Sequence, residues 1–156
     1  MCSSDLVQDA VRGFDALAGD RRLIVRSDRI EPSKNIVRGL LAFETLLEER
    51  AEWRGRVVLA ALVNPSRETL PVYLRLRREV EETVERINDR WARGDWTPVI
   101  LDARDDYARS LAGLTRADVL LVNPIRDGLN LVAKEGPIVN RRDAPLCLSR
   151  DAGAFD

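Results

Sequence analysis

Histidine is absent from this chain of 156 residues. Without an imidazole, the chain supplies no Ser-His-Asp or Cys-His nucleophile pair, no histidine-ligated metal and no histidine general base. Its two cysteines, Cys2 and Cys147, are too few for a disulfide framework, so a reducing compartment, the cytoplasm, is expected. Chemistry in this stretch is left to arginine, lysine, carboxylates and backbone amides, and no metal or other cofactor is expected.

An excess of positive charge is also missing. The 25 basic residues face 26 acidic ones, which leaves a net charge of −1. This balance argues against a nucleic-acid or membrane-surface partner. No apolar run approaches the roughly 20 residues that span a bilayer, and no signal peptide is visible. The length and the 45% hydrophobic content suit one domain with one core.

Both ends of the chain read as cut. Residues 1–6 (MCSSDL) do not resemble the start of a domain. After a GTG start, CSSDL can be back-translated as TGC TCT TCC GAT CT, the end of a common sequencing adapter. We expect 1–6 to be a non-native artefact and residues 149–156 to be a loop that opens another helix. The expectation is a single domain over 7–156, truncated at both ends, and a naturally short domain with frayed ends is the alternative.

Short apolar runs alternate with segments of helical period. Strands are predicted over 23–25, 57–63, 97–101, 119–122 and 145–148, and helices over 36–47, 73–91, 107–114 and from 129 onward. Ser33 is the expected N-cap of the first of these helices, and Cys147 the expected buried hydrophobe of the last strand. The tryptophans are expected to pack in the core or at helix ends. The alternation predicts an α/β fold, a doubly wound Rossmann-like parallel sheet with helices on both faces.

Ligands of such sheets bind beyond the carboxyl ends of the strands, where two loops, 26–35 and 123–131, carry unusual residues. The first contains Lys34, one of only two lysines among the 25 basic residues. Arg29 and Lys34 flank a turn and a helix start, which suits a phosphate clamp. The alternative is a pair of exposed cations that neutralise Asp28 and Glu31. Lys134, the other lysine, follows the second loop, and its placement carries no argument of its own.

The second loop leads into a predicted helix. Gly128 permits a tight turn, and the next amides, those of 129–131, are expected to be free to bind a phosphate or sugar hydroxyls. Asp127 suits sugar hydroxyls, and Glu135 suits a ribose diol. An ordinary helix N-cap by Asp127 is the alternative.

Four segments together resemble the trehalose-6-phosphate synthase family. They are RSDRIEPSKNIVRGLLAFETLLEER, AEWRGRVVLAALVNPSRE, RREVEETVERIND and LLVNPIRDGLNLVAKEG. This family consists of retaining glycosyltransferases of the GT-B fold, and the resemblance is to their C-terminal, nucleotide-sugar-binding half. It implies a donor-binding domain whose acceptor-binding N-terminal half lies upstream.

The resemblance also implies roles for the residues that match the family's motifs. Arg29 and Lys34 match the pair that holds the donor diphosphate and acts in catalysis. The donor sugar would be bound by Asp127, Gly128, Leu129 and Asn130. The nucleotide would be bound by Arg29, Lys34, Leu131, Val132 and Glu135, the last on the ribose.

The reaction implied is transfer of glucose from a nucleoside-diphosphate glucose, UDP-glucose or GDP-glucose, to glucose 6-phosphate with retention. The fragment alone is expected to be inactive, and a homo-oligomer is possible. Departures from the family pattern include Glu31-Pro32 for Asp-Tyr, Asn35 for Gly, and Asn123 where Thr is common. They leave two alternatives open. One is a pseudo-glycosyltransferase that couples a nucleotide-activated cyclitol to an amino-cyclitol phosphate, and the other is a catalytically silent regulatory domain that binds nucleotide sugar.

Overall fold

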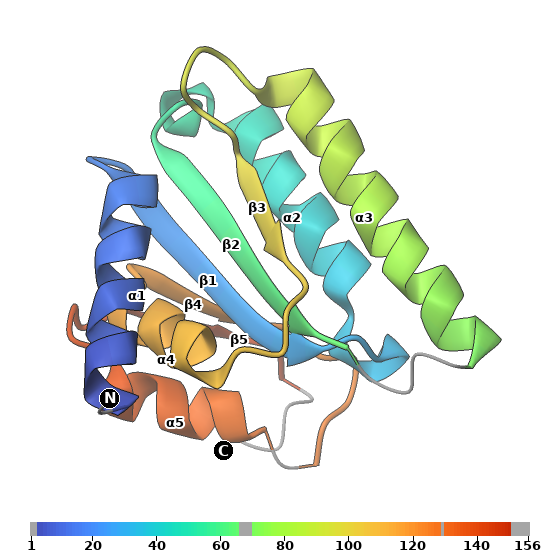
Figure 1. The fold of residues 1–156 in the computed structure, drawn as a ribbon. Helices are drawn as coiled ribbons and strands as arrows, with labels where there is room; N and C mark the ends of the chain where they lie inside the picture. The colour runs from blue at the N-terminus through green and yellow to red at the C-terminus, as the bar shows by residue number, and fades with distance from the viewer. Residues whose placement is uncertain (1–2, 66–69, 129, 151–156) are drawn as a thin grey trace.

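The fold is seen in a computed structural model that describes residues 3–65, 70–128 and 130–150 (Figure 1). The strands are β1 (Arg22–Arg29), β2 (Val57–Asn64), β3 (Val99–Asp102), β4 (Val119–Val122) and β5 (Leu146–Leu148). The helices are α1 (Ser3–Ala18), α2 (Ile36–Glu49), α3 (Pro71–Trp91), α4 (Tyr107–Arg116) and α5 (Leu131–Val139), with short 3-10 helices η1 (Pro32–Lys34) and η2 (Ala51–Trp53). The predicted alternation of strand and helix is confirmed.

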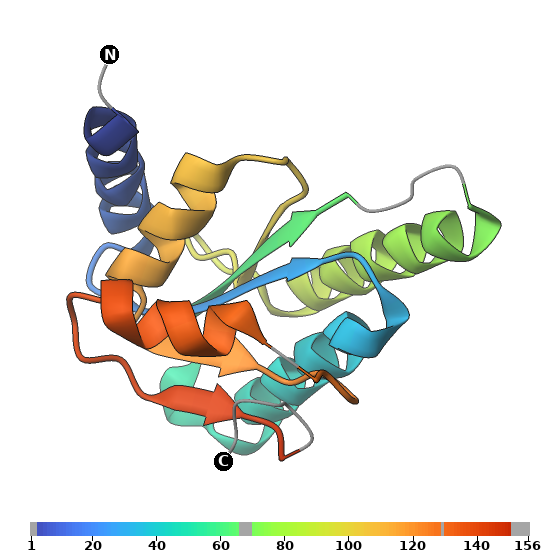
Figure 2. The ribbon, with the colours of Figure 1, turned by 90° about the horizontal axis from the view of Figure 1, so that it is seen from below.

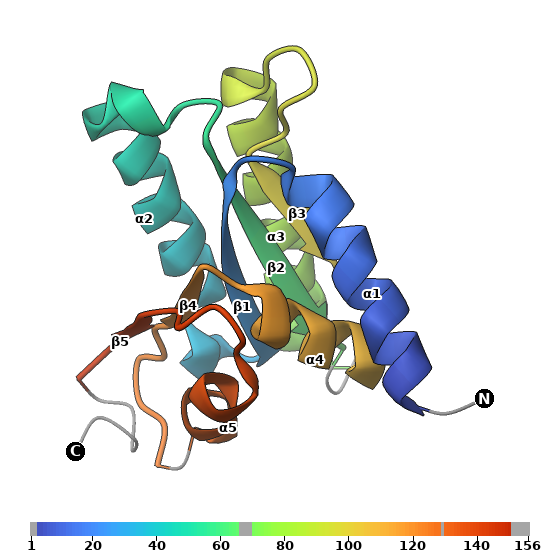
Figure 3. The same ribbon diagram turned by 90° about the vertical axis from the view of Figure 1, so that its left-hand side faces the viewer.

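The strands form one parallel sheet in the order β3-β2-β1-β4-β5. Helices α2 and α3 cover one face, and α1, α4 and α5 cover the other (Figure 3). The predicted doubly wound α/β class is therefore confirmed. The direction of winding reverses between β1 and β4, which makes the carboxyl ends of these two strands the place where such a sheet opens a crevice.

The core lies between the sheet and its two helical layers. Strand β2 is buried from Val57 to Val63, as its unbroken apolar run requires. Trp91 is the last residue of α3 and is buried. Trp96 is 3% exposed, and its Nε1 donates a hydrogen bond of 2.8 Å to the carbonyl of Val57. Trp53 is half-buried against the same core. The tryptophans are core residues, as predicted.

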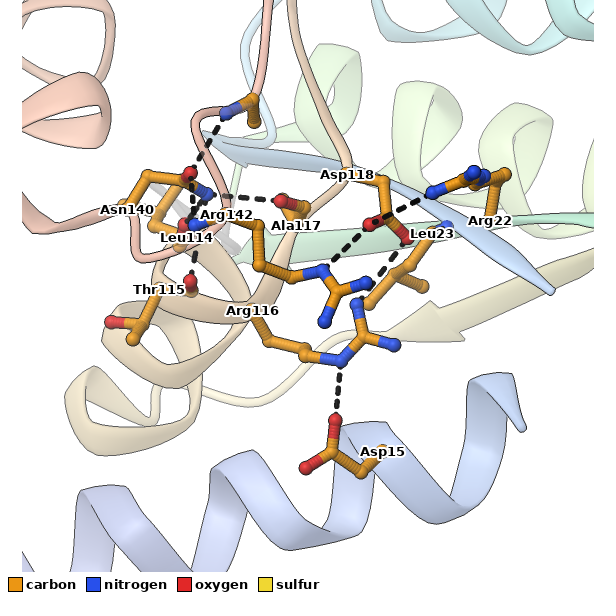
Figure 4. A network of polar contacts seen from close by, with 11 residues as sticks. Asp15, Arg22, Leu23, Leu114, Thr115, Arg116, Ala117, Asp118, Asn140 and Arg142 are labelled. Carbon is orange, nitrogen blue, oxygen red and sulfur yellow. Dashed lines mark hydrogen bonds and ion pairs between the residues drawn. The ribbon is translucent and has the colours of Figure 1, made fainter. Parts of the chain in front are cut away.

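Helix α1 was not expected from the sequence. It buries Phe14 and Ala18, and it packs on α4. A polar network at the amino ends of the strands also holds it (Figure 4). There the buried Arg116 pairs with Asp15 of α1, and its Nη1 donates to Asp118 at 3.3 Å.

Asp118 is the centre of that network. Its carboxylate accepts 2.8 Å from the backbone N–H of Leu23 and 2.7 Å from Nε of Arg142 (Figure 4). Burial raises the pKa of Asp118, but the bonds from Leu23 and Arg142 and the charge of Arg116 outweigh it and leave the pKa below its usual value. The network ties α1, β1, α4 and the loop after α5 at the end of the sheet opposite the two loops singled out above.

Several local expectations were wrong. The first strand does not end at Val25, because Arg26 and Asp28 pair inside it and let β1 run on to Arg29. Ser33 is not the N-cap of α2, because η1 intervenes and Asn35 takes that position.

Cys147 is exposed rather than buried, because the strand order leaves β5 at the edge of the sheet. Residues 151–156, expected to begin a helix, lie outside the described residues. In the described part of the chain, no helix has the length and apolar character to cross a membrane.

Candidate donor-binding site

A pocket of about 320 Å³ opens at the carboxyl ends of the central strands. The loops after β1 and β4 both lie at this lower end of the sheet in Figure 1 and can be followed from below in Figure 2. The lining residues are Ser27, Asp28, Arg29, Glu31, Lys34, Asn64, Asn130, Leu131 and Val132. The pocket thus lies at the reversal of winding, where a doubly wound sheet binds its ligand.

Arg29 and Lys34 both line this pocket. Arg29 ends β1 with an exposed side chain beside Asn64 of β2, whereas the Lys34 side chain is 19% exposed. The two cations therefore border one pocket, as the predicted phosphate clamp requires.

Lys34 is bound to the second loop. Its Nζ donates a hydrogen bond of 2.7 Å to Oδ2 of Asp127, and both side chains are largely buried. Nδ2 of Asn130 donates to the same oxygen at 3.0 Å. A cation from the loop after β1 and a carboxylate from the loop after β4 thus meet at the pocket, with Asn130 between α5 and Asp127.

Asp127 is not the N-cap of the last helix, so that alternative is wrong. Asn130 is the N-cap, since its Oδ1 accepts a hydrogen bond of 2.8 Å from the N–H of Ala133. For this reason α5 begins at Leu131, two residues later than expected. The amides at the helix start beside the pocket are those of Leu131 and Val132, whereas Leu129 lies outside the described residues.

Three of the predicted site residues that the structure describes lie outside the pocket lining: Asp127, Gly128 and Glu135. Asp127 is joined to the pocket by its bond to Lys34. Gly128 has no left-handed φ, and no described atom lies within 4 Å of where its Cβ would be, so the described surroundings do not require a glycine. Glu135 is exposed on the second turn of α5, and Lys134 is exposed beside it.

Arg26 and Asp28 form a buried ion pair below the pocket, with Nε of Arg26 2.8 Å from Oδ2 of Asp28. Burial raises the pKa of Asp28, although the charge and hydrogen bond of Arg26 oppose the rise. Sequence reasoning placed these two residues in a loop and gave Arg26 no role. The signal that could have found them is a salt-bridging pair two residues apart, on one face of a strand.

Two departures from the family pattern contact each other. Asn35 has a φ of 60°, a left-handed conformation that glycine and asparagine tolerate best. Its Nδ2 donates 3.1 Å to the carbonyl of Asn123, and Nδ2 of Asn123 donates 3.3 Å to the carbonyl of Asn35. This reciprocal pair joins the two loops on either side of the pocket.

No group of three or more Cys, Asp or Glu side chains that could hold a metal ion is found within residues 3–65, 70–128 and 130–150. The polar groups at the pocket are instead two cations, carboxylates, amides and a helix start. Fold and site define the chain as a Rossmann-like α/β domain whose pocket suits an anionic ligand.

The comparisons with known proteins name the family. The model of glycosyltransferase family 20 matches residues 1–156, and the chain belongs to this family. The chain is 38% identical over 141 residues to a bifunctional trehalose-6-phosphate synthase/phosphatase of Thermoproteus tenax, covering 88% of this chain and 19% of the relative. It is 35% identical over 153 residues to a glucosylglycerol-phosphate synthase of Synechocystis, covering 97% and 31%.

Solved structures agree with the fold. An α,α-trehalose-phosphate synthase (UDP-forming) of Burkholderia xenovorans in complex with glucose-6-phosphate matches with a TM-score of 0.88 at 35% identity, covering 97% of this chain and 35% of that one. A trehalose-6-phosphate protein of E. coli bound with UDP-2-fluoro glucose matches with a TM-score of 0.86 at 28% identity, covering 99% and 36%. The chain thus spans about a third of these proteins, and the GT-B resemblance is confirmed.

Proposed function

We propose that this chain is the donor-binding part of a retaining glucosyltransferase that moves glucose from UDP-glucose to glucose 6-phosphate. The observation that carries the proposal is that Arg29 and Lys34 line one pocket between β1 and β4, where Lys34 is bonded to Asp127 of the loop after β4. The two similar solved structures, one with glucose-6-phosphate and one with UDP-2-fluoro glucose, support the choice of donor and acceptor.

In this proposal Arg29 and Lys34 neutralise the diphosphate as it leaves. Charge grows on the leaving group in the transition state, and a preplaced donor at such a position contributes roughly 3–4 kcal/mol in comparable sites. The amides of Leu131 and Val132 add the positive end of α5. Catalysis from this part is electrostatic and requires no side-chain nucleophile.

The donor sugar would lie against the second loop. Asp127 accepts hydrogen bonds from sugar hydroxyls, Asn130 holds Asp127 in place, and Gly128 and Leu129 complete the family's sugar-binding segment. A nucleoside that extends from the pocket along α5 would bring its ribose to Glu135. The acceptor would be bound by a separate half of a longer chain.

A second acceptor is favoured by one observation. Several similar proteins are glucosylglycerol-phosphate synthases, among them the one from Synechocystis. The residues described above would serve the donor in either case, so the acceptor is decided elsewhere.

The test is a transfer assay on a chain that carries both halves, with radiolabelled UDP-glucose offered to glucose 6-phosphate and to glycerol 3-phosphate in parallel. Trehalose 6-phosphate with both anomeric carbons in the α configuration, assigned by NMR, is the expected product. Transfer to glycerol 3-phosphate alone would replace the acceptor. If neither UDP-glucose nor GDP-glucose is hydrolysed or used for transfer, the glucosyltransferase proposal is refuted.

A further inference from the structure

Arg26 is a cation without access to solvent in the middle of the central strand. Its side chain is 0% exposed. A buried charge costs free energy unless its surroundings compensate it. The compensating contacts all lead toward the pocket: Nε donates 2.8 Å to Asp28, which lines it, and Nη2 donates 3.1 Å to the backbone carbonyl of Lys34.

Helix α2 leaves room for this guanidinium at one position. A Cβ on Gly39 would lie 2.1 Å from Nη1 of Arg26 and 3.0 Å from Oδ1 of Asn123. Both of these atoms are buried and have no hydrogen-bond partner in the described part of the chain. Nη1 of Arg26 is a donor and Oδ1 of Asn123 is an acceptor, and both lie close to the position of that Cβ. The guanidinium therefore still has a donor available on the side of the loop after β4.

The loop after β4 is fastened at the same place. Asn123 exchanges two hydrogen bonds with Asn35, and the N–H of Ile125 donates 2.9 Å to the carbonyl of Ser33. Ser33 and Asn35 flank Lys34 in the sequence, and the residues that they contact precede Asp127 in the loop after β4. The position of the Lys34 backbone thus depends on one cluster made of Arg26, Gly39, Asn35 and Asn123.

We propose that Arg26 is a positioning residue for the diphosphate clamp. This inference rests on the proposed function above. Arg26 fixes the Lys34 backbone and the Asp28 carboxylate, so that the Lys34 ammonium lies at the correct distance from the donor diphosphate. It does not touch the donor. Its effect is therefore specific to the phosphate part of the ligand and leaves the binding of base and ribose unchanged.

The test compares UDP with UMP, which lacks the second phosphate, by calorimetric titration of the wild-type protein and the Arg26→Met variant. We expect Arg26→Met to weaken UDP binding at least tenfold and to change UMP binding by less than twofold. Arg26→Lys, which keeps the charge but loses the second contact, is expected to fall between. A merely structural role would weaken both ligands alike.

Two further variants keep the inference testable if Arg26→Met does not fold. Gly39→Ala forces the guanidinium aside and is expected to reproduce the selective loss of UDP. In an Arg26→Met background the same alanine meets no guanidinium and is expected to add no further loss. Arg116→Met is the matched control, because it removes another buried arginine at the opposite end of the sheet and is expected to leave the ratio of UDP to UMP affinity unchanged.

The outcomes separate the two proposals. If wild-type protein binds UDP, and folded Arg26 and Gly39 variants keep its ratio of UDP to UMP affinity, the positioning role is refuted and the proposed function stands. If wild-type protein binds neither nucleotide, the UDP-dependent function is refuted and the positioning role falls with it.

Discussion

The ammonium of Lys34 donates a hydrogen bond of 2.7 Å to the carboxylate of Asp127, 93 residues further along the chain. The pair joins the loop after β1 to the loop after β4, which the sheet order places side by side. It also gives Lys34 a partner in the absence of any donor. A diphosphate bound by Lys34 would therefore have to share or replace its contact with Asp127, so a substitution at Asp127 should change the binding of a diphosphate.

Asp127→Asn is expected to free Lys34 for the diphosphate. Because a largely buried ion pair of this kind contributes about 1 kcal/mol, UDP should bind about fivefold more tightly to the variant than to the wild type. UDP-glucose should lose part of its advantage over UDP, since a neutral amide replaces the charged acceptor of its sugar hydroxyls. Calorimetry with the two ligands measures both effects, and weaker binding of UDP by the variant would show that Asp127 does not restrain Lys34.

Glu44 is expected to make the stability depend on acid pH. This carboxylate of α2 is 4% exposed and accepts 3.0 and 2.7 Å hydrogen bonds from Arg86 and 2.9 Å from Arg90, both on α3. The bonds from Arg86, followed by those from Trp91 and Arg90, lower the pKa of Glu44 to about 2 against the opposing effect of burial. Because the pKa of Glu44 is lower in the folded state than in the unfolded state, its ionised form stabilises the fold above the unfolded pKa. This stabilisation is lost as pH falls from about 4.5 to 2.

Glu44→Gln should therefore lower the free energy of unfolding near pH 7. The loss should be limited to on the order of 2 kcal/mol, because the two arginines are half-exposed and solvent screens part of the interaction. The difference from wild type should shrink as pH falls through that window. Denaturant unfolding at several pH values measures it. Glu48→Gln is the control, since Glu48 is exposed and pairs with Arg90 alone among the contacts described, and an equal pH dependence of the two differences would contradict the assignment.

Gly113 and Gly13 give a matched test of the packing between α4 and the sheet. A Cβ on Gly113 would lie 2.7 Å from Cδ1 of Leu62 and 3.3 Å from Cγ1 of Val25, whereas a Cβ on Gly13 of α1 has no described atom within 4 Å. Gly113→Ala should destabilise by about 1–3 kcal/mol through overpacking. Gly13→Ala should stabilise by about 0.5–1 kcal/mol because it improves helix propensity. Thermal melts of the two variants measure both changes in stability. A stabilised Gly113→Ala variant would show that α4 can shift to accommodate the added methyl group.

The period of the apolar residues was enough to predict the sheet and most of its helices. Strand β2 and helix α3 lie where an unbroken apolar run and a 3–4 spacing indicate them. Helix α1 was missed because no helix was expected over 7–18, although its first residues fall in the segment 1–6 whose foreign origin stays a prediction. The second half of β1 escaped because Arg26 and Asp28 resemble loop residues until their mutual pairing is known.

The site was predicted as two loops, and its contacts come from the order of the strands. Alternation alone does not say that β1 and β4 are neighbours, so the pairing of Lys34 with Asp127 could not be read from the sequence. The same holds for Asn35 and Asn123, two departures from the family pattern that prove to be partners. The exposure of Cys147 likewise depends on β5 being an edge strand.

The most direct test of the donor-binding account is a calorimetric titration with UDP, GDP and ADP, using wild-type protein, Lys34→Ala and Lys134→Ala. The last is a matched control, because Lys134 is the chain's other lysine and is exposed on α5 outside the pocket. The account predicts that UDP binds, that Lys34→Ala weakens it about 10- to 100-fold through the loss of a charge-assisted hydrogen bond, and that Lys134→Ala leaves it unchanged. Binding of UDP that is equal in all three proteins, or absent from a folded wild type, would contradict it.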